Sequence, residues 1–429
     1  MKKHLLFLFF CLTLLLGLLL SAVPALAAEN VIFLSDGAKG DGSSAASPLK
    51  PTTGNFDKSQ AAPPQQKDTA LYQAVLKLIE RGGGTIVFCG PYTLDETTGQ
   101  GSGSAKDLMF DFKYYHPEIT ITYTSVWDGV DYREKNGAML ILNTQAHYVS
   151  PTASVWKNLT VGIGATERTI CCGGNKALFG EGFTSCPIDK SNEGNSEFYL
   201  NVCGGERYRK LEVGTTDVTV DIGDGILGGV FGGQSGAGVN YPLTANTSVK
   251  IKSGTVLGDV GGGSRLSSTP VDGSSKVLIE GGVFRGTVSA AGQGGFLTET
   301  RKATLTITGG DFSACRGIVD LASGVSGFLP KESLLDYSSV DEETAFQIHR
   351  VASLFTEIRA AEFSFEDFIR EESTTDPAGP GEEAIPELPE RISFVRISTL
   401  TAFLLFVFAV LLFVLIGRGV SSLRRRKKN

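Results

Sequence analysis

Four stretches decide the fold: Val218-Thr-Val-Asp-Ile-Gly-Asp-Gly225, Ser248-Val-Lys-Ile-Lys-Ser-Gly254, Lys276-Val-Leu-Ile-Glu-Gly-Gly282 and Thr304-Leu-Thr-Ile-Thr-Gly-Gly310. Their last glycines are 29, 28 and 28 residues apart, as their residue numbers show. In each stretch apolar residues alternate with other residues, which is typical of a strand that has one buried face. Short strands and glycine turns that repeat in this way predict a β-solenoid, in which stacked turns share a core that no single turn could bury.

The repeats align in two apolar rows and one row between them. The apolar rows are Val220, Val249, Val277, Leu305 and Ile222, Ile251, Ile279, Ile307. The row between them, expected to face outward, is Asp221, Lys250, Leu278, Thr306. Residues at the same position on neighbouring turns then lie about 4.8 Å apart. The alignment also places Lys252 beside Glu280, which predicts an exposed ladder of salt bridges.

Residues 36–94 carry a resemblance to a known superfamily. It is carried by Asp36-Gly-Ala-Lys-Gly-Asp-Gly42, Lys67-Asp-Thr-Ala-Leu-Tyr-Gln-Ala-Val75 and Gly82-Gly-Gly-Thr-Ile-Val-Phe-Cys-Gly-Pro-Tyr-Thr-Leu94. This order resembles the opening of the right-handed parallel β-helix proteins of the pectate-lyase-like superfamily, where a glycine turn, a capping helix and the first core strand follow one another. The insert 43–66 departs from that pattern. The resemblance implies an all-β, right-handed parallel β-helix, but it does not fix a reaction, because the superfamily includes lyases, hydrolases, tailspikes and adhesins.

Both ends of the chain predict export and anchoring. Residues 1–27 have a basic start, an apolar stretch and a small-residue cleavage site, so they predict a signal peptide. The apolar run 397–416 is long enough to span a bilayer and is followed by a basic end, which predicts a transmembrane helix at 396–417 and a cytoplasmic tail at 418–429. We therefore expect a single-pass protein of the cell membrane, with the lipid bilayer as one partner and its N-terminal domain outside.

Three segments are expected between these ends. Residues 28–330 form the β-helix domain with a short N-terminal capping helix. Residues 331–370 form a helical C-terminal cap, since Ile348, Val351 and Leu354 recur at helical spacing. Residues 371–395 form an acidic, Pro-rich spacer.

Charge and cysteine content limit the possible partners. Residues 28–390 contain 29 of the 39 Lys and Arg and all 46 Asp and Glu, a net charge of 29 − 46 = −17. Such a surface repels nucleic acid, so no nucleic-acid partner is expected. Six cysteines remain after removal of the signal peptide, and the sequence leaves open whether they are buried thiols or form disulfides.

The sequence offers candidate site residues but no clear catalytic motif. The Gly-His-Gly and Arg-x-Lys pattern of the polygalacturonase-like relatives is absent from the repeats. A calcium-assisted lyase would need converging carboxylates around Ca²⁺ and a basic residue. The main candidates are Asp221, Asp224, Glu280, Arg285, Asp311 and Arg316, with Asp259 and Arg265 as further ones. Aromatic candidates for a glycan platform are Tyr114, Tyr115, Trp127 and Tyr132.

These observations favour a surface protein that displays a binding or adhesive surface, with glycans or other surfaces as expected ligands. A surface-tethered polysaccharide lyase or hydrolase is the first alternative, and no cofactor is expected unless a lyase uses Ca²⁺. A structural surface stalk is the second alternative. We expect no convergent catalytic site, because the outward residues can equally form the salt ladder.

Overall fold

The computed structural model describes the solenoid region of the chain. The described residues are 30–50, 69–94, 108, 110, 112–143, 147–207, 210–235, 242–266, 269–298, 301–322 and 328–361. The signal peptide, spacer, transmembrane helix and tail predicted from the sequence lie outside them. Within the described ranges, no helix is long and apolar enough to cross a membrane.

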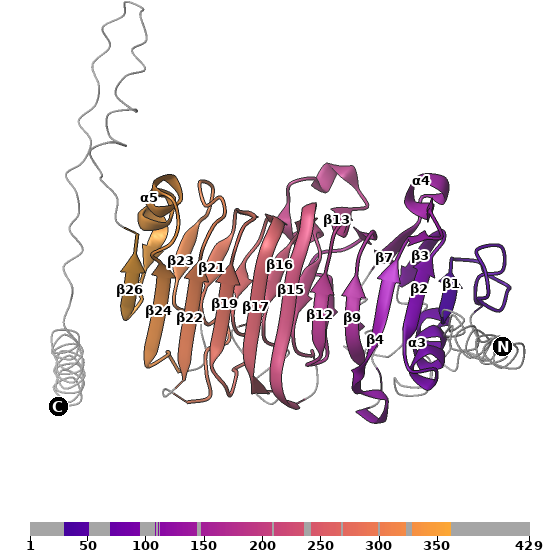
Figure 1. Cartoon of the computed structure of the whole chain (residues 1–429), viewed down its shortest axis with the longest axis horizontal. Coiled ribbons are helices and arrows are strands. Elements are labelled where there is room, and N and C mark those ends of the chain that lie inside the picture. Colours follow the sequence, from indigo (N-terminus) through magenta and orange to yellow (C-terminus); the bar gives the residue numbers. More distant parts are fainter. Residues whose placement is uncertain are drawn as a thin grey trace, which may run out of the picture. The chain divides into compact units, whose positions relative to one another are not determined.

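Long parallel sheets make up most of the described structure, as a β-solenoid requires. Strands that are neighbours in a sheet come from successive turns of the chain, so the turns stack beside one another (Figure 1). We name the three parallel sheets sheet 1, sheet 2 and sheet 3.

Sheet 1 contains β1 (Val31–Leu34), β2 (Gly84–Phe88), β4 (His116–Thr124), β9 (Thr152–Trp156), β12 (Lys176–Phe179), β15 (Leu211–Leu227), β17 (Leu243–Val256), β19 (Ser275–Ile279), β22 (Lys302–Ile307), β24 (Glu332–Tyr337) and β26 (Glu357–Ala360), with β20 (Val283–Phe284) paired to β17. Sheet 2 contains β3 (Pro91–Leu94), β7 (Met139–Leu142), β10 (Thr160–Ile163) and β13 (Thr184–Pro187).

Sheet 3 contains β8 (Tyr148–Val149), β11 (Thr169–Cys171), β14 (Asn201–Cys203), β16 (Gly229–Phe231), β18 (Val260–Gly261), β21 (Thr287–Ser289), β23 (Gly317–Val319) and β25 (Ala352–Ser353). A small antiparallel pair joins β5 (Val126–Trp127) to β6 (Val130–Asp131). The helices are α3 (Ala70–Glu80), α4 (Tyr132–Asn136) and α5 (Glu342–Val351), and the 3-10 turns are η1 (Phe112–Tyr114), η2 (Lys190–Asn192) and η3 (Ser196–Phe198).

The predicted ladders are confirmed for the last three repeats. Val249 pairs with Val277, which pairs with Leu305, and Ile251, Ile279 and Ile307 form the second row. The six side chains are at most 1% exposed, so they line the core of the solenoid. The glycine spacing of 28 therefore measures one turn in this part of the chain.

The alignment of the first repeat was wrong by two residues. Val220 pairs with Ile251, an offset of 251 − 220 = 31, whereas Ile226 pairs with Thr255, an offset of 29. A register irregularity between these positions contains Gly223 in the left-handed region, with φ of 62°. The glycine that we aligned in the first repeat, Gly225, lies within this irregular stretch, so its distance from Gly254 does not give the register of Val220. Thr219, and not Asp221, therefore lies opposite Lys250.

Helix α3 lies where the resemblance implied a capping helix. It begins after Thr69, whose side chain accepts a hydrogen bond of 3.1 Å from the backbone of Tyr72. Its buried face, which includes Leu71, Val75 and Leu78, packs at the β1 and β2 end of the core (Figure 1). An N-cap of this kind satisfies one of the free N–H groups of the first helical turn.

The C-terminal region differs from the predicted helical cap. Helix α5 is present, and Asp341 caps it by accepting a 2.8 Å bond from the backbone of Thr344. However, β24 precedes α5 and β25 and β26 follow it, so 331–370 is not a separate helical segment. Ile358 in β26 continues the ladder from Leu335 and is 48% exposed, while Leu335 is fully buried. The solenoid thus continues at least to Ala360.

Candidate functional site

A layer of stacked loops follows the strands of sheet 3. The N–H of Gly205 donates to the carbonyl of Gly233 (2.8 Å), and the N–H of Gly233 donates to that of Gly263 (2.9 Å). A Cβ atom on Gly232 would lie 2.2 Å from the carbonyl oxygen of Gly262, so no side chain fits between these turns. The loops therefore pack backbone against backbone and hold the polar residues that follow them at fixed positions.

The sequence contains a signal for this layer that our alignment did not use. It is the recurrence of Val202-Cys-Gly-Gly205, Val230-Phe-Gly-Gly233 and Val260-Gly-Gly-Gly263, whose first residues are 28 and 30 positions apart. The valine enters the core and the glycines begin the stacked loop. Aligning this second series would have placed Asp259 directly before a strand of sheet 3 and Arg265 in the loop that follows the same strand.

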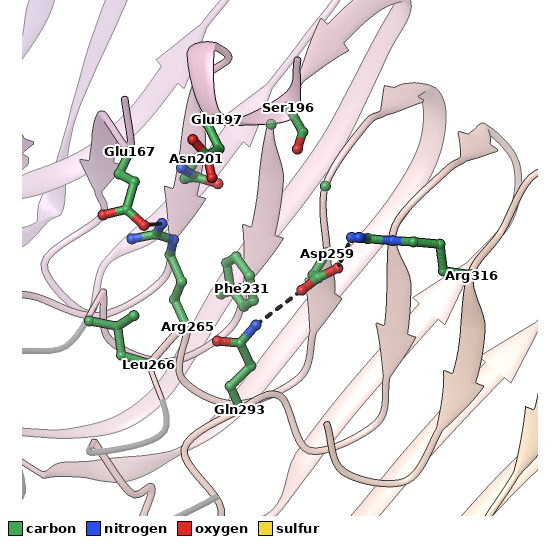
Figure 2. A pocket seen from close by; sticks show the side chains of 12 residues that line it. Glu167, Ser196, Glu197, Asn201, Phe231, Asp259, Arg265, Leu266, Gln293 and Arg316 are labelled. Carbon is green, nitrogen blue, oxygen red and sulfur yellow. Dashed lines mark hydrogen bonds and ion pairs between the residues drawn. The ribbon is translucent and has the colours of Figure 1, made fainter. Parts of the chain in front are cut away.

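A polar groove lies beside this layer on sheet 3, and we call it the sheet 3 groove (Figure 2). Its volume is about 220 Å³. The polar and charged residues that line it are Glu167, Ser196, Glu197, Asn201, Asp259, Arg265, Gln293 and Arg316. They come from the turns around β11, β14, β18, β21 and β23, so the groove crosses several turns of the solenoid. The buried ring of Phe231 contributes apolar surface.

Asp259 is the centre of the hydrogen bonds in the groove. Its carboxylate accepts from the backbone N–H of Thr287 (2.9 Å), from Nε2 of Gln293 (3.0 Å) and from a guanidinium nitrogen of Arg316 (3.0 Å). These partners lie on the next two turns. An ionised carboxylate has about four acceptor positions, so one more hydrogen bond can be accepted from a ligand.

Arg265 and Glu167 form the opposite side of the groove (Figure 2). A guanidinium nitrogen of Arg265 lies 2.9 Å from Oε1 of Glu167, and the Arg265 side chain is only 12% exposed. The backbone N–H of Glu167 donates to the carbonyl of Glu197 (2.9 Å), which ties η3 to this wall. Glu167 also has a left-handed φ of 65°, a backbone conformation that costs free energy in a residue other than glycine.

A buried charged cluster lies next to Arg265. His147 is 2% exposed, and its two ring nitrogens lie 3.3 Å from Arg168 and 3.2 Å from Arg207. Burial, and then the positive charges of Arg207, Arg168 and Arg265, hold the pKa of His147 well below its ordinary value. The imidazole is therefore neutral near neutral pH. Glu206, which is fully buried, accepts a hydrogen bond from the hydroxyl of Tyr115.

Two of the sequence candidates lie on the outer face of sheet 1, away from the groove. Asp221 lies 3.5 Å from Nζ of Lys252, and Glu280 lies 2.7 Å from Nζ of Lys250. A salt ladder is therefore present, but Glu280 pairs with Lys250 and not with Lys252 as the alignment suggested. Asp224 is exposed and lies in β15, directly after Gly223.

Of the remaining candidates, Arg316 lines the groove and Asp311 and Arg285 do not. Hydrogen bonds from Ser313, and to a smaller extent the charge of Arg285, lower the pKa of Asp311. Glu167, Glu197 and Gln293 were not candidates. The first two lie in the irregular part of the chain, where no repeat spacing could have placed them beside Asp259.

The aromatic candidates do not form one platform. Tyr114 and Tyr115 are partly buried against the main core. Trp127 and Tyr132 belong to a separate cluster with Phe33, whose ring lies 6.4 Å from that of Tyr132, edge to face. Tyr132 is only 7% exposed.

The cysteines are free thiols in this structure. They are Cys89, Cys171, Cys172, Cys186, Cys203 and Cys315, and all except Cys186 are buried. Burial raises the pKa of Cys172 and of Cys315, which keeps these thiols protonated. Within the part of the chain that the structure describes, no three His, Cys, Asp or Glu side chains lie where they could together hold a metal ion.

Comparisons with protein-family models, with curated proteins and with solved structures each found no match to this chain.

Proposed function

We propose that this chain is a cell-surface protein that binds glycans in the sheet 3 groove. The observation that carries the proposal is the convergence of Asp259, Arg265, Gln293 and Arg316 with two further carboxylates in one groove. Many hydrogen-bonding groups line the groove, and its apolar surface is small. That combination suits a ligand rich in hydroxyl groups, because each hydroxyl both donates and accepts.

The ion pairs in the groove favour binding over catalysis. Arg265 is paired with Glu167, and Arg316 is paired with Asp259. A carboxylate partner stabilises the protonated guanidinium, whereas an arginine that acts as a base must lose its proton. The resemblance to the pectate-lyase-like superfamily and its right-handed β-helix supports polysaccharide as the ligand class and keeps a lyase or hydrolase as the alternative.

A glycan screen tests the proposal and separates it from the alternative. Full-length protein in detergent micelles should retain a subset of immobilised glycans. It should release neither unsaturated nor reducing ends from them, with or without Ca²⁺. The variant Asp259→Asn should lose this binding, while Glu280→Gln on the outer face of sheet 1 should keep it. Product release that depends on Asp259 or Arg316 would establish the enzyme instead, and no binding to any glycan would favour the stalk.

We further propose that the run 397–416 holds the protein in the cell membrane with the solenoid outside. The proposal is supported by the apolar length and the basic end of that segment. Deleting the chain from Arg396 onward should release the protein into the medium. If the shortened protein stays with the membrane fraction, another part of the chain is the anchor.

A further inference from the structure

We infer that the sheet 3 groove takes an uncharged oligosaccharide that runs along the solenoid axis, and not a polyuronate or a sulfated glycan. This inference rests on the proposed function and specifies its ligand.

The charges of the groove argue against an anionic ligand. Three carboxylates line it, those of Glu167, Glu197 and Asp259, against the two guanidinium groups of Arg265 and Arg316. The lining thus has a net charge of 2 − 3 = −1. Both arginines are already paired with carboxylates of the chain. An anionic sugar would have to break one of these pairs to obtain a cation.

Glu197 adds a further obstacle to anions. It lies on the turn η3, is exposed, and forms no ion pair within the described residues. Glu197 and Asp259 both line the groove and are drawn apart from each other in Figure 2. A ligand carboxylate or sulfate between Glu197 and Asp259 would face two negative charges. The net charge of −17 on residues 28–390 acts in the same direction at longer range.

The order of the lining residues fixes the direction of the ligand. Along sheet 3 the strands follow in the order β11, β14, β16, β18, β21, β23, which is five strand spacings or roughly 24 Å. Glu167 lies near the first of these strands and Arg316 near the last. One strand spacing is close to the length of one sugar unit in an extended chain. Successive sugars along the axis can therefore meet Asn201, Asp259 and Gln293 in turn.

The volume of the groove supports a single chain of sugars. The groove volume of about 220 Å³ is enough for one sugar ring, so the other units of the chain would extend along the solenoid on both sides of it. Phe231 is only 2% exposed, so ring stacking is a small part of the contact. Hydrogen bonds to hydroxyl groups must then supply most of the specificity.

Affinity measurements with full-length protein in detergent micelles test the inference. The probes are neutral hexose oligosaccharides of four to six units and oligogalacturonates of the same length, at low and high salt. We expect binding of at least one neutral series, a dissociation constant that salt leaves unchanged within about twofold, and about tenfold weaker binding by Asp259→Asn. Glu280→Gln, which removes a charge from sheet 1, is the matched control.

Three outcomes are distinguishable. Neutral binding that is lost in Asp259→Asn and kept in Glu280→Gln supports the inference. Oligogalacturonate binding that weakens with salt and is lost in Arg316→Ala overturns the inference but leaves glycan binding in the groove intact. Binding of neither series, or binding unaffected by Asp259→Asn, overturns the inference together with the groove as the ligand site.

Discussion

A guanidinium nitrogen of Arg316 lies 3.0 Å from Oδ1 of Asp259, although the two residues belong to turns that are two apart in sheet 3. The Arg316 side chain is 63% exposed and that of Asp259 is 26% exposed. Exposed ion pairs of this kind stabilise folded proteins by only about 0–1 kcal/mol. The pair is therefore better placed to shape the groove than to hold the turns together.

Replacing Arg316 with alanine should leave stability almost unchanged. We expect the free energy of unfolding to fall by at most ~1 kcal/mol, measured by urea denaturation. Asp259→Ala should cost more, because the N–H of Thr287 and the amide of Gln293 lose their acceptor as well. Equal costs for the two variants would contradict this description of Asp259 as the centre of the network.

The core ladder gives a second prediction. Ile279 is fully buried between Ile251 and Ile307, so Ile279→Ala should reduce the free energy of unfolding by about 2–5 kcal/mol. Its neighbour Leu278 points outward and is only partly buried, so Leu278→Ala should cost less than ~1.5 kcal/mol. Urea denaturation of both variants measures these losses. A larger loss in the free energy of unfolding for Leu278→Ala than for Ile279→Ala would mean that the strand faces are reversed.

The stacked loops give a third prediction. A Cβ atom on Gly262 would lie 2.0 Å from the carbonyl oxygen of Ala290, so Gly262→Ala must push two turns apart. We expect a loss of about 1–3 kcal/mol in the free energy of unfolding. A Cβ atom on Gly214 in β15 would have no neighbour within 4 Å, so Gly214→Ala is the control. If both variants unfold at the same urea concentration, the backbones of the loops are not in contact.

The buried His147 predicts a dependence of stability on pH. Its pKa is lower in the folded protein than its ordinary value of 6.5. The unfolded chain therefore binds a proton that the folded protein does not, and stability falls as the pH drops below about 6.5. The slope contributed by this one group is at most about 1.4 kcal/mol per pH unit.

Unfolding measured between pH 7 and pH 5 checks this prediction. His147→Gln should reduce the slope, because it removes the group that takes up a proton only when the protein unfolds. This window lies above the range in which Asp311, whose pKa is lowered, takes up a proton. An unchanged slope in His147→Gln would show that His147 is not the group responsible.

The repeats allowed the solenoid to be predicted, because glycine turns and alternating apolar residues are local in sequence. Helix α3 was expected only because residues 67–75 resemble the capping-helix segment of the pectate-lyase-like superfamily. The register of Val220 was not predictable, since the irregularity around Gly223 changes the count of residues without changing the alternation. The exposure of Ile358 at the end of the ladder could not be predicted either, because it depends on which strand is the last of the sheet.

The candidate site was only partly predictable from the sequence. Arg316, Asp259 and Arg265 were candidates because they lie in the regular repeats. Glu167, by contrast, is 98 residues from its partner Arg265 and lies in the irregular part of the chain. Its position depends on how many turns the intervening chain makes, and no local pattern gives that number.

Calorimetric titration of one neutral oligosaccharide into three forms of the full-length protein tests the central claim most directly. The forms are wild type, Asp259→Asn and Glu280→Gln, and the ligand is the tightest binder of the glycan screen. If the sheet 3 groove is the binding site, Asp259→Asn should bind the ligand about tenfold more weakly than wild type, and Glu280→Gln should bind it with unchanged affinity. Equal affinity of Asp259→Asn and wild type would contradict the claim.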